Sequence, residues 1–559
     1  MTRKVVFVAL LLLAGCSTHK QAQTALEMQA DPWVLHPKFG ANDSAWLSNG
    51  SVGFVLGHKP AVFHWESYES TGEEKIVPYA DKLLPELEVT SQNMLTGVVT
   101  TKDGESWVLP RAEDALISDR NRVISTSKAG VRLIQGDTQN RFMRASQENS
   151  RLWQTDIEID GPIEDQIAVR SFLYYLRGGV AKRPSPFGLS STLYSGHVFW
   201  DADIWMFPAL ALLDPDRAKY VSDYRLRLVS QAESNAAQWL ADGRQTASGS
   251  VQSTYDSGRP FAIVKFPWES GVTGKETVPG SSRFEEHITG SVLFGLCQAQ
   301  ALGFLDSSAI SKLRAMAANY YRLRSEASKS LREIHGVMSP DEFHVGDNDL
   351  YTNLLAEWLM NGCSWNDKPS FKLPRDATTF LTYDNDLLKA YKQASAVLAI
   401  YPLQYPPAER EARAMMERFG SKVIKNGPAM SDSIHSIIWA RMGDSERAYG
   451  AWLASWRPFT NHSFLLFSEK RNQERTYFLT GAAGSLQSVL YGFIGFRIDS
   501  RKEPGAMWAK QLNGGFWLSA KPHLPRAWKR VTLKNFYVLG KKYNLTATHS
   551  NLTVTLGDQ

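Results

Sequence analysis

The sequence predicts a multidomain α+β protein, and three features of its pattern indicate this class. From about residue 39 to residue 163, short alternating apolar and polar runs are separated by turn residues, as in antiparallel sheets. From there to about residue 495, apolar residues recur at helical spacing. The last stretch alternates again. A chain of 559 residues is long enough for two or three such domains.

The N-terminus has the features of an export signal. Arg3 and Lys4 precede an apolar run, residues 5–13, that is too short to span a bilayer core of roughly 30 Å. The Leu-Ala-Gly-Cys sequence that ends at Cys16 resembles a bacterial lipobox, which implies cleavage and lipidation of Cys16. We therefore expect a lipoprotein anchored in the bacterial cell envelope, facing the periplasm or the cell exterior. A plain signal peptide with an incidental cysteine is the alternative.

Composition excludes several classes of protein. The net charge is +5, or +3 without Arg3 and Lys4, and basic and acidic residues are interspersed, so nothing indicates a nucleic-acid partner. Besides Cys16, the sequence holds Cys297 and Cys363, too few for a disulfide scaffold and without the nearby histidines of a zinc site. The sequence leaves open whether these two pair. The 17 Trp and 20 Tyr offer flat faces for sugar rings, although most aromatics fill a core.

Each region has its own local signals. In the first, GSVGFVLG and GVRLIQGD alternate next to turn residues, and segment 165–177 regains helical spacing as a link to the second region. In the second, residues 308–324 place apolar side chains on one face, and residues 406–420 begin with Pro and end with Gly. In the third, residues 530–558 alternate and turn like a small β domain.

Long loops between the predicted helices concentrate acidic side chains beside aromatics. Recurrent helices joined by such loops are expected to form a ring of helix pairs with a site at one mouth. Hydrolysis of a glycosidic bond needs two carboxyl groups, one kept protonated in a partly dry setting and one ionised to activate water. The four loops of this kind are GHVFWDADIWMFP (196–208), FPWESGVTGKETVP (266–279), GVMSPDEFHVGDNDLYTN (336–353) and NHSFLLFSEKRNQERTYFLTGAAGSLQ (461–487).

These loops resemble segments of glycoside hydrolase family 65, which contains disaccharide phosphorylases and glucoside hydrolases. GHVFWDADIWMFP resembles the family's G-H-x-F-W-D-T-E-x-x-M-x-P, PWESGVTGKE its P-W-E-S-A-x-T-G-x-E, and SPDEFHVGDNDLYTN its G-P-D-E-Y-H-x-x-x-x-N-N-x-Y-T-N. EEHITGSVLFGL resembles its H-I-x-x-D helix start, YKQASAVLAIYPL its K-Q-A-D-V-V-L-L-x-Y-P, and LPRAWKRVTL its L-P-x-x-W segment. The matches keep the family's order from about Gly188 to the end of the chain.

The resemblance implies a domain layout. A β-sandwich is followed by a linker helix, an (α/α)6 barrel that carries the catalytic site, and a small C-terminal β domain. The boundaries that we expect are a signal peptide over 1–16, a tether over 17–37, the β-sandwich over 38–165, the linker helix and barrel over 166–503, and the C-terminal β domain over 504–559.

The resemblance also implies roles for individual residues. Glu342 is implied to be the general acid, with Asp341 and His344 as polar neighbours. Further residues are implied to contact the substrate: Trp200, Asp201, Asp203, Lys392 and Gln393 around the glucosyl unit, Trp268, Glu269 and Glu276 around the leaving sugar, and His287 at a helix start.

The fourth loop distinguishes hydrolases from phosphorylases. Family phosphorylases have no catalytic base and hold phosphate with a loop of the form T-S-S-G-G-I-H. This chain has TYFLTGAAGSLQ, which resembles the hydrolases' N-F-L-T-G-x-G-G-F-L-Q, and FLLFSE, which resembles their P-F-x-x-W-S-E. The resemblance therefore implies that Glu469 is the general base. A surface glutamate in a charged run is the alternative.

We therefore expect an inverting α-glucosidase that releases β-glucose from a small α-glucoside, with a kojibiose-like α-1,2 linkage or a glucosyl-galactose as first choice. The alternatives, in order, are an α,α-trehalase, a disaccharide phosphorylase and a non-catalytic glycan-binding lipoprotein. No cofactor or metal is expected, since the acidic residues lack the spacing of a calcium loop. The sugar linkage stays open because four positions depart from the family pattern: Asp203, Ser291, Ser395 and Phe467.

Overall fold

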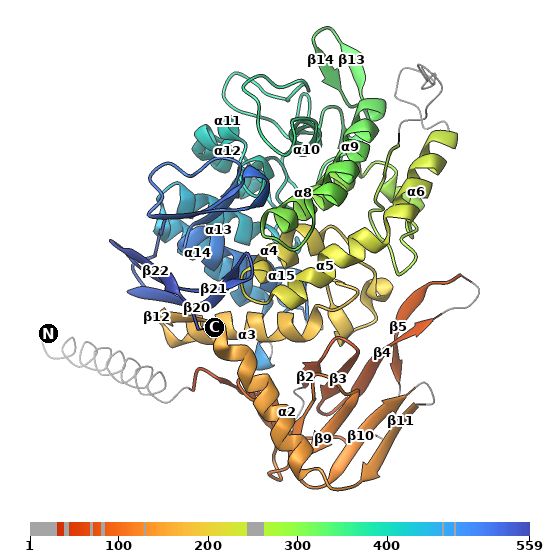
Figure 1. The fold of residues 1–559 in the computed structure, drawn as a ribbon, viewed down its shortest axis with the longest axis vertical. Helices are drawn as coiled ribbons and strands as arrows, with labels where there is room; N and C mark the ends of the chain where they lie inside the picture. The colour runs from red at the N-terminus through yellow and green to blue at the C-terminus, as the bar shows by residue number, and fades with distance from the viewer. Residues whose placement is uncertain are drawn as a thin grey trace, which may run out of the picture.

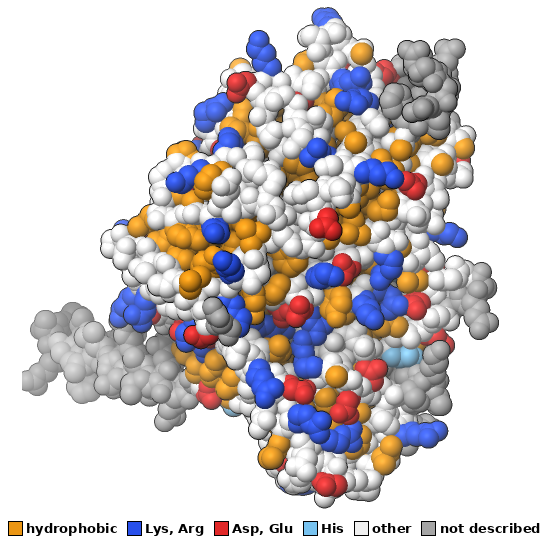
Figure 2. All heavy atoms as spheres, in the orientation of Figure 1, with side chains coloured by type: hydrophobic (Ala, Val, Ile, Leu, Met, Phe, Trp, Pro, Cys, Tyr) orange, Lys and Arg blue, Asp and Glu red, His pale blue; other side chains and the backbone are white. Residues whose placement is uncertain are grey.

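Figure 1 shows a body of helices with β-sheets on two sides of it. On the face shown in Figure 2, basic and acidic side chains are interspersed.

The predicted signal peptide with Cys16, and most of the predicted tether, lie outside the described residues. No helix within the described ranges is long and apolar enough to cross a membrane. The computed structural model describes residues 31–38, 44–67, 71–79, 84–127, 130–242, 262–460, 463–473 and 477–558.

Two antiparallel sheets form the N-terminal region. Their apolar side chains are buried together, so that Trp46 and Phe54 of one sheet share a core with Trp107 and Ile124 of the other. The smaller sheet has the order β2 (Ala45–Ser48), β3 (Val52–Leu56), β4 (Ala61–Ser67), β5 (Glu74–Tyr79). The larger has the order β1 (Val34–Leu35), β6 (Val89–Asn93), β7 (Val98–Thr101), β8 (Ser106–Val108), β9 (Ala115–Ser118), β10 (Arg122–Ser127), β11 (Gly130–Gln135). Helix α2 (Gln139–Arg151) packs against β8 and β9.

The helical body combines fully buried helices with amphipathic ones. Helices α8 (His287–Ala301), α10 (Leu350–Met360) and α15 (Leu479–Gln487) bury nearly every residue, so they lie inside the body. Helix α9 (Ser307–Arg324) confirms the helix predicted over 308–324, and its buried face packs against α8 and α10. The remaining helices are α3 (Ile163–Gly179), α4 (Phe207–Ala211), α5 (Pro215–Arg227), α6 (Val229–Ala241), α7 (Pro279–Ser282), α11 (Pro406–Arg410), α12 (Ala412–Phe419), α13 (Ser431–Arg441) and α14 (Ser445–Trp456).

Two local predictions are refined by the structure. The link predicted over 165–177 is the longer helix α3, which packs against α15. The segment predicted as one helix over 406–420 is two helices, α11 and α12, that meet at Glu411. The apolar stripe of α12 is nevertheless buried as the spacing predicts.

The C-terminal β region extends beyond the stretch that the sequence indicated. Strand β12 (Asp156–Asp160) falls within the predicted N-terminal domain, but it pairs antiparallel with β20 (Arg530–Val538). The resulting sheet has the order β12-β20-β21-β22, with β21 at Lys541–Thr548 and β22 at Leu552–Leu556. A second sheet has the order β17 (Phe496–Asp499), β19 (Trp517–Ala520), β18 (Trp508–Gln511), and so begins before the predicted boundary at 504. Alternation predicts a strand's buried face but not its partner.

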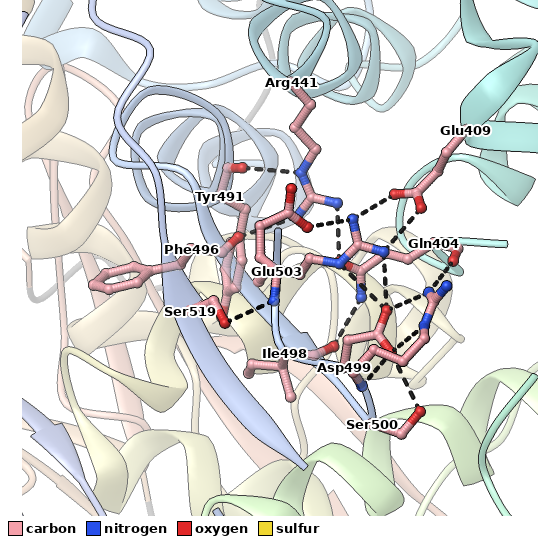
Figure 3. Close-up of polar contacts among 12 residues, drawn as sticks. Gln404, Glu409, Arg441, Tyr491, Phe496, Ile498, Asp499, Ser500, Glu503 and Ser519 are labelled. Carbon is pink, nitrogen blue, oxygen red and sulfur yellow. Dashed lines mark hydrogen bonds and ion pairs between the residues drawn. The ribbon is translucent and has the colours of Figure 1, made fainter. Parts of the chain in front are cut away.

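A polar network fastens this second sheet to the helical body (Figure 3). Arg497 on β17 binds both carboxylate oxygens of Glu409 on α11, at 2.7 and 2.9 Å, and it also pairs with Asp499 and Glu503. Arg441, at the end of α13, donates to one side-chain oxygen and two backbone carbonyls of the same region. Largely buried charges that are all hydrogen-bonded make this junction specific.

The two cysteines beyond the signal peptide meet inside the helical body. Cys297 lies on α8 and Cys363 follows α10, and both are buried. Their Sγ atoms are 2.7 Å apart, and both are free thiols in this structure. The structure thus brings into contact a pair whose relation the sequence left open.

Candidate active site

The loop that carries Glu342 forms a tight hairpin. Strands β15 (Val337–Met338) and β16 (Val345–Gly346) pair antiparallel, and Glu342 lies between them with a φ of 59°. A glutamate rarely adopts this left-handed conformation, so the surrounding contacts have to hold it. The hairpin therefore presents one carboxylate in a defined direction.

Asp341 supplies those contacts. Its buried carboxylate accepts hydrogen bonds from the Ser339 hydroxyl at 2.6 Å and from the Phe343 N–H at 3.3 Å. Its second oxygen lies 3.0 Å from Nδ1 of His344. Asp341 and His344 thus lie beside Glu342, and their contacts shape the turn that carries it.

Lys392 and Gln393, in the loop between α10 and α11, bind Glu342 itself. The Lys392 ammonium pairs with Oε2 of Glu342, and the Gln393 amide donates to Oε1 at 3.4 Å. Burial acts to lower the pKa of Lys392, but nearby carboxylates outweigh it and raise the pKa above its usual value. These carboxylates are Glu342, Glu469 and Asp201.

Glu469 reaches the same place from the loop before α15. Its two carboxylate oxygens lie 3.5 and 3.4 Å from the Tyr194 hydroxyl. Tyr194 is 44% exposed, but its partial burial raises its pKa above the usual value, and the charges of Glu469, Asp201 and Glu342 add to the rise. The charges of Glu469 and Glu342 therefore influence the same side chains, Lys392, Tyr194 and Asp201. We call these five residues the carboxylate cluster: Glu342, Glu469, Asp201, Lys392 and Tyr194.

Asp201 is the most deeply buried carboxylate of the cluster. It is 7% exposed and accepts a hydrogen bond from the Thr480 hydroxyl at 2.7 Å. Burial raises the pKa of Asp201 to about 7, and the charges of Glu342 and Glu469 contribute to the rise. Asp201 therefore changes its charge near neutral pH.

We expect Asp201→Asn to stabilise the protein at alkaline pH. The folded pKa of about 7 lies above the unfolded value of roughly 4, so the folded state binds more protons between them and the free energy of unfolding falls as pH rises through this window. Asparagine does not titrate and keeps an acceptor for Thr480. The gain, at most about 4 kcal/mol above about pH 7, should vanish toward about pH 4. Thermal unfolding across this range measures it, and a pH-independent difference would contradict the assignment.

Trp200 and His287 belong to one buried aromatic group. Trp200 is 2% exposed, and its ring centroid lies 4.7 Å from that of Trp205, 4.6 Å from His287 and 6.0 Å from Tyr351. His287 lies 3.1 Å from the Glu285 carboxylate, but burial lowers the pKa of His287 to about 4. The imidazole is therefore neutral at physiological pH.

The loop after α6 is held largely by its own side chains. The Glu276 carboxylate accepts from the backbone N–H groups of Trp268 at 2.8 Å and Glu269 at 3.4 Å. The Glu269 carboxylate lies 2.6 Å from Nδ1 of His197. Trp268 is half-buried, edge-on to Phe199 at 5.9 Å. Glu276 and Glu269 therefore shape the loop, while part of the Trp268 side chain stays exposed.

Asp203 lies apart from the cluster in its contacts. Its carboxylate forms a buried ion pair with Arg225 on α5, at 2.6 Å, and Arg225 also donates to the Phe199 carbonyl at 2.8 Å. In the structure Asp203 is thus the partner of Arg225, and its contact with the substrate stays a prediction. Asp203 lies in a short π-helix, Ala202–Met206, that begins directly after Asp201, so the pair ties this helical turn to α5.

We expect Asp203→Asn to lower the free energy of unfolding by roughly 3–5 kcal/mol, because it leaves the Arg225 charge buried without its partner. Urea unfolding measures the loss. The matched control is Asp223→Asn, which removes an exposed partner of Lys219 on the same helix and should cost at most about 1 kcal/mol. Similar small losses in both variants would show that the buried pair does not stabilise the fold.

Tyr194 was not assigned from the sequence. It stands two residues before the GHVFWD segment, and its position depends on left-handed backbone at Tyr194 and Ser195, with φ of 51° and 52°. Non-glycine residues give no sequence signal for that conformation.

Among the described residues, no group of three or more His, Cys, Asp or Glu side chains is arranged to hold a metal ion.

Known proteins resemble this chain in both sequence and fold. Over 440 residues it is 31% identical to the kojibiose hydrolase of Flavobacterium johnsoniae, an alignment that covers 73% of this chain and 59% of the relative. Over 416 residues it is 29% identical to the protein-glucosylgalactosylhydroxylysine glucosidase of Gallus gallus, covering 67% and 56%. The chain thus spans little more than half the length of these relatives.

A solved structure, described as a kojibiose phosphorylase from the human microbiome, superposes with a TM-score of 0.65 over 95% of both chains. At 14% sequence identity, this similarity is one of fold alone. Residues 181–380, which include Asp201 and Glu342 of the cluster, match the central catalytic domain of glycosyl hydrolase family 65. With the sequence identities above, this match shows that the chain belongs to glycoside hydrolase family 65.

Proposed function

We propose that this protein is a glycoside hydrolase, an inverting α-glucosidase that removes a terminal α-linked glucose from a small α-glucoside and releases β-glucose. The carboxylate cluster carries the proposal. Glu342 and Glu469 come from separate loops and act on the same Lys392 and Tyr194. An inverting glycosidase needs two such carboxyl groups, one as acid and one as base.

Glu342 is the proposed general acid and Glu469 the proposed general base. The glycosidic oxygen takes the proton of Glu342 as its bond to the anomeric carbon breaks. A water on the far face of the sugar forms the new bond and gives its proton to Glu469. Because Lys392 pairs with Glu342 in the free protein, we expect a sugar hydroxyl to compete for the ammonium before Glu342 carries its proton.

Asp201 is the proposed anchor for the glucosyl unit. Its buried carboxylate belongs to the cluster, and one of its oxygens accepts a hydrogen bond from Thr480. The neighbouring Trp200 packs against other aromatic side chains. On the leaving side, Phe343 directly follows the acid and is 53% exposed. Trp268 is half-buried. Exposed aromatic faces suit the apolar side of a sugar ring.

Hydrolysis is favoured over phosphorolysis because Glu469 reaches the cluster, whereas phosphorolysis requires no base. The two sequence relatives named above are hydrolases, whereas the phosphorylase is similar in fold alone. We propose a kojibiose-like α-1,2 linkage or a glucosyl-galactose as the first substrates to test, and α,α-trehalose next. A glycan-binding lipoprotein without turnover is disfavoured because the chain retains both Glu342 and Glu469.

We also propose that α3 to α15 form an (α/α)6 barrel, supported by buried helices covered by amphipathic ones and by the fold similarity. Lipidation of Cys16 and a position in the bacterial cell envelope remain part of the proposal. Mass spectrometry of the mature protein for a lipid on Cys16 tests the anchor.

Proton NMR during turnover tests the reaction. Protein without the first sixteen or so residues is offered kojibiose, glucosyl-galactose and trehalose, each with and without phosphate. Early β-glucose that does not depend on phosphate supports an inverting hydrolase and ranks the linkages. Early α-glucose contradicts inversion, and glucose 1-phosphate formed only with phosphate contradicts the role of Glu469. Binding without turnover of any sugar contradicts an enzyme.

A further inference from the structure

We propose that Tyr194 is a positioning residue that orients the base Glu469, and that a β-hairpin of the N-terminal region holds Tyr194 in place; this inference rests on the proposed function. The starting observation is the contact between the Tyr194 hydroxyl and both oxygens of Glu469, at 3.4 and 3.5 Å. Bonds of this length are usual in an unliganded site and shorten when substrate binds.

The backbone around Tyr194 is held in an uncommon conformation. Tyr194, Ser195 and Gly196 are left-handed in succession, with φ of 51°, 52° and 75°. Such strain persists only where the surroundings impose it, and it is found mainly at functional sites. The Tyr194 ring lies against Phe187 and Phe199, with centroids 5.8 and 5.2 Å apart. These contacts fix the direction of the phenol.

The N-terminal region packs against this strained turn. A Cβ on Gly196 would lie 2.6 Å from Cγ1 of Ile76 and 2.7 Å from Cη2 of Trp65. Ile76 on β5 and Trp65 on β4 are directly paired across the hairpin, so they form one surface against which only glycine fits. The hairpin therefore determines where the backbone at Tyr194 can run.

Two polar contacts fasten the hairpin to the helical body. Glu74 on β5 forms an ion pair with Arg183, which follows α3. Glu73, just before β5, accepts a hydrogen bond from the Thr273 hydroxyl in the loop that carries Trp268. The hairpin is therefore attached on both sides of the strained turn and cannot shift independently of it.

In the proposed role, Tyr194 donates a hydrogen bond to Glu469 and keeps its proton. Burial and the neighbouring carboxylates raise the pKa of Tyr194, so the phenol stays protonated at physiological pH. Its O–H then donates to one oxygen of the ionised Glu469 and leaves the other oxygen for water. Tyr194, Lys392 and Asp201 are the groups that interact with the charge of Glu469. Each of them also interacts with the charge of Glu342. The hydrogen bond from Tyr194 therefore restricts the orientation of the Glu469 carboxylate.

Tyr194→Phe in the full chain tests the positioning role. We expect kcat to fall about 10- to 100-fold, the range for a lost hydrogen bond to a charged group, with KM little changed. KM should stay near the wild-type value because the lost bond orients the base and does not hold the sugar. The matched control is Tyr449→Phe, whose hydroxyl donates to Asp165 at 2.7 Å outside the cluster. It should leave kcat unchanged.

Ile76→Ala tests the role of the hairpin, with Ile76→Val as the conservative control. If Ile76 acts through Tyr194, Ile76→Ala lowers kcat in the wild type but has no further effect in Tyr194→Phe, a non-additivity that a double-mutant cycle reveals. Additive losses would overturn the hairpin's role. A kcat of Tyr194→Phe within about twofold of the wild type, or a loss that appears in KM alone, would overturn the positioning role. If the wild type hydrolyses no glucoside, the proposed function fails and this inference fails with it. Thermal unfolding checks that each variant is folded.

Discussion

Glu342→Gln is expected to lower kcat on an α-glucosyl disaccharide at least about a hundredfold, because general acid catalysis contributes roughly that much or more. Glutamine keeps the shape of the side chain and an oxygen that Lys392 can bind. It cannot give a proton to the glycosidic oxygen. The loss should therefore appear in kcat, with little change in KM. Steady-state kinetics on disaccharide measures it.

A second substrate separates a lost acid from a general defect. Fluoride leaves without protonation, so α-glucosyl fluoride should be hydrolysed by Glu342→Gln at a rate much closer to that of the wild type. Glu333→Gln is the matched control, since Glu333 lies on β14 (Leu331–Glu333) and pairs with Lys372 away from the cluster. Near-normal turnover of disaccharide by Glu342→Gln would refute its role as the acid.

Glu469→Ala is expected to lower kcat by about 10²–10⁴-fold on the disaccharide and on α-glucosyl fluoride alike. The physical reason is that water must lose a proton as it attacks, whichever group leaves. The two variants are thus distinguished by their response to the fluoride: the acid variant recovers and the base variant does not. Exposed Glu417 on α12 provides the control, and Glu417→Ala should retain activity.

Azide provides an independent test of Glu469. Azide is a nucleophile that needs no base, and it fits the space that the shortened side chain leaves. It should restore turnover of α-glucosyl fluoride by Glu469→Ala and give β-glucosyl azide, the product of inversion. Formation of α-glucosyl azide would contradict inversion. Glucose 1-phosphate made by this variant at the wild-type rate would identify a phosphorylase instead.

Local sequence determined much of this protein. Alternation between turn residues was enough to predict N-terminal strands such as β3 and β11, and helical spacing was enough to predict α9, because both patterns depend on neighbours within a few positions. The helix α2, inside the region predicted as β, was missed. The density of acids and aromatics in four loops is likewise a property of the sequence by itself. The resemblance of these loops to family segments, each within one loop, is what implies roles for Asp201, Glu342 and Glu469.

The tertiary structure alone decided how distant parts meet. The alternation of β12 is the same whether it pairs in the N-terminal sheets or with β20, so its partner depends on long-range packing. In the same way, Asp203 is a loop carboxylate by sequence and becomes the partner of Arg225 only because α5 packs beside it. Tyr194 meets Glu469 because a strained, left-handed turn is held by a hairpin from another region. Contacts of this kind bring together residues that are far apart in the sequence, and a pattern of neighbouring residues does not specify them.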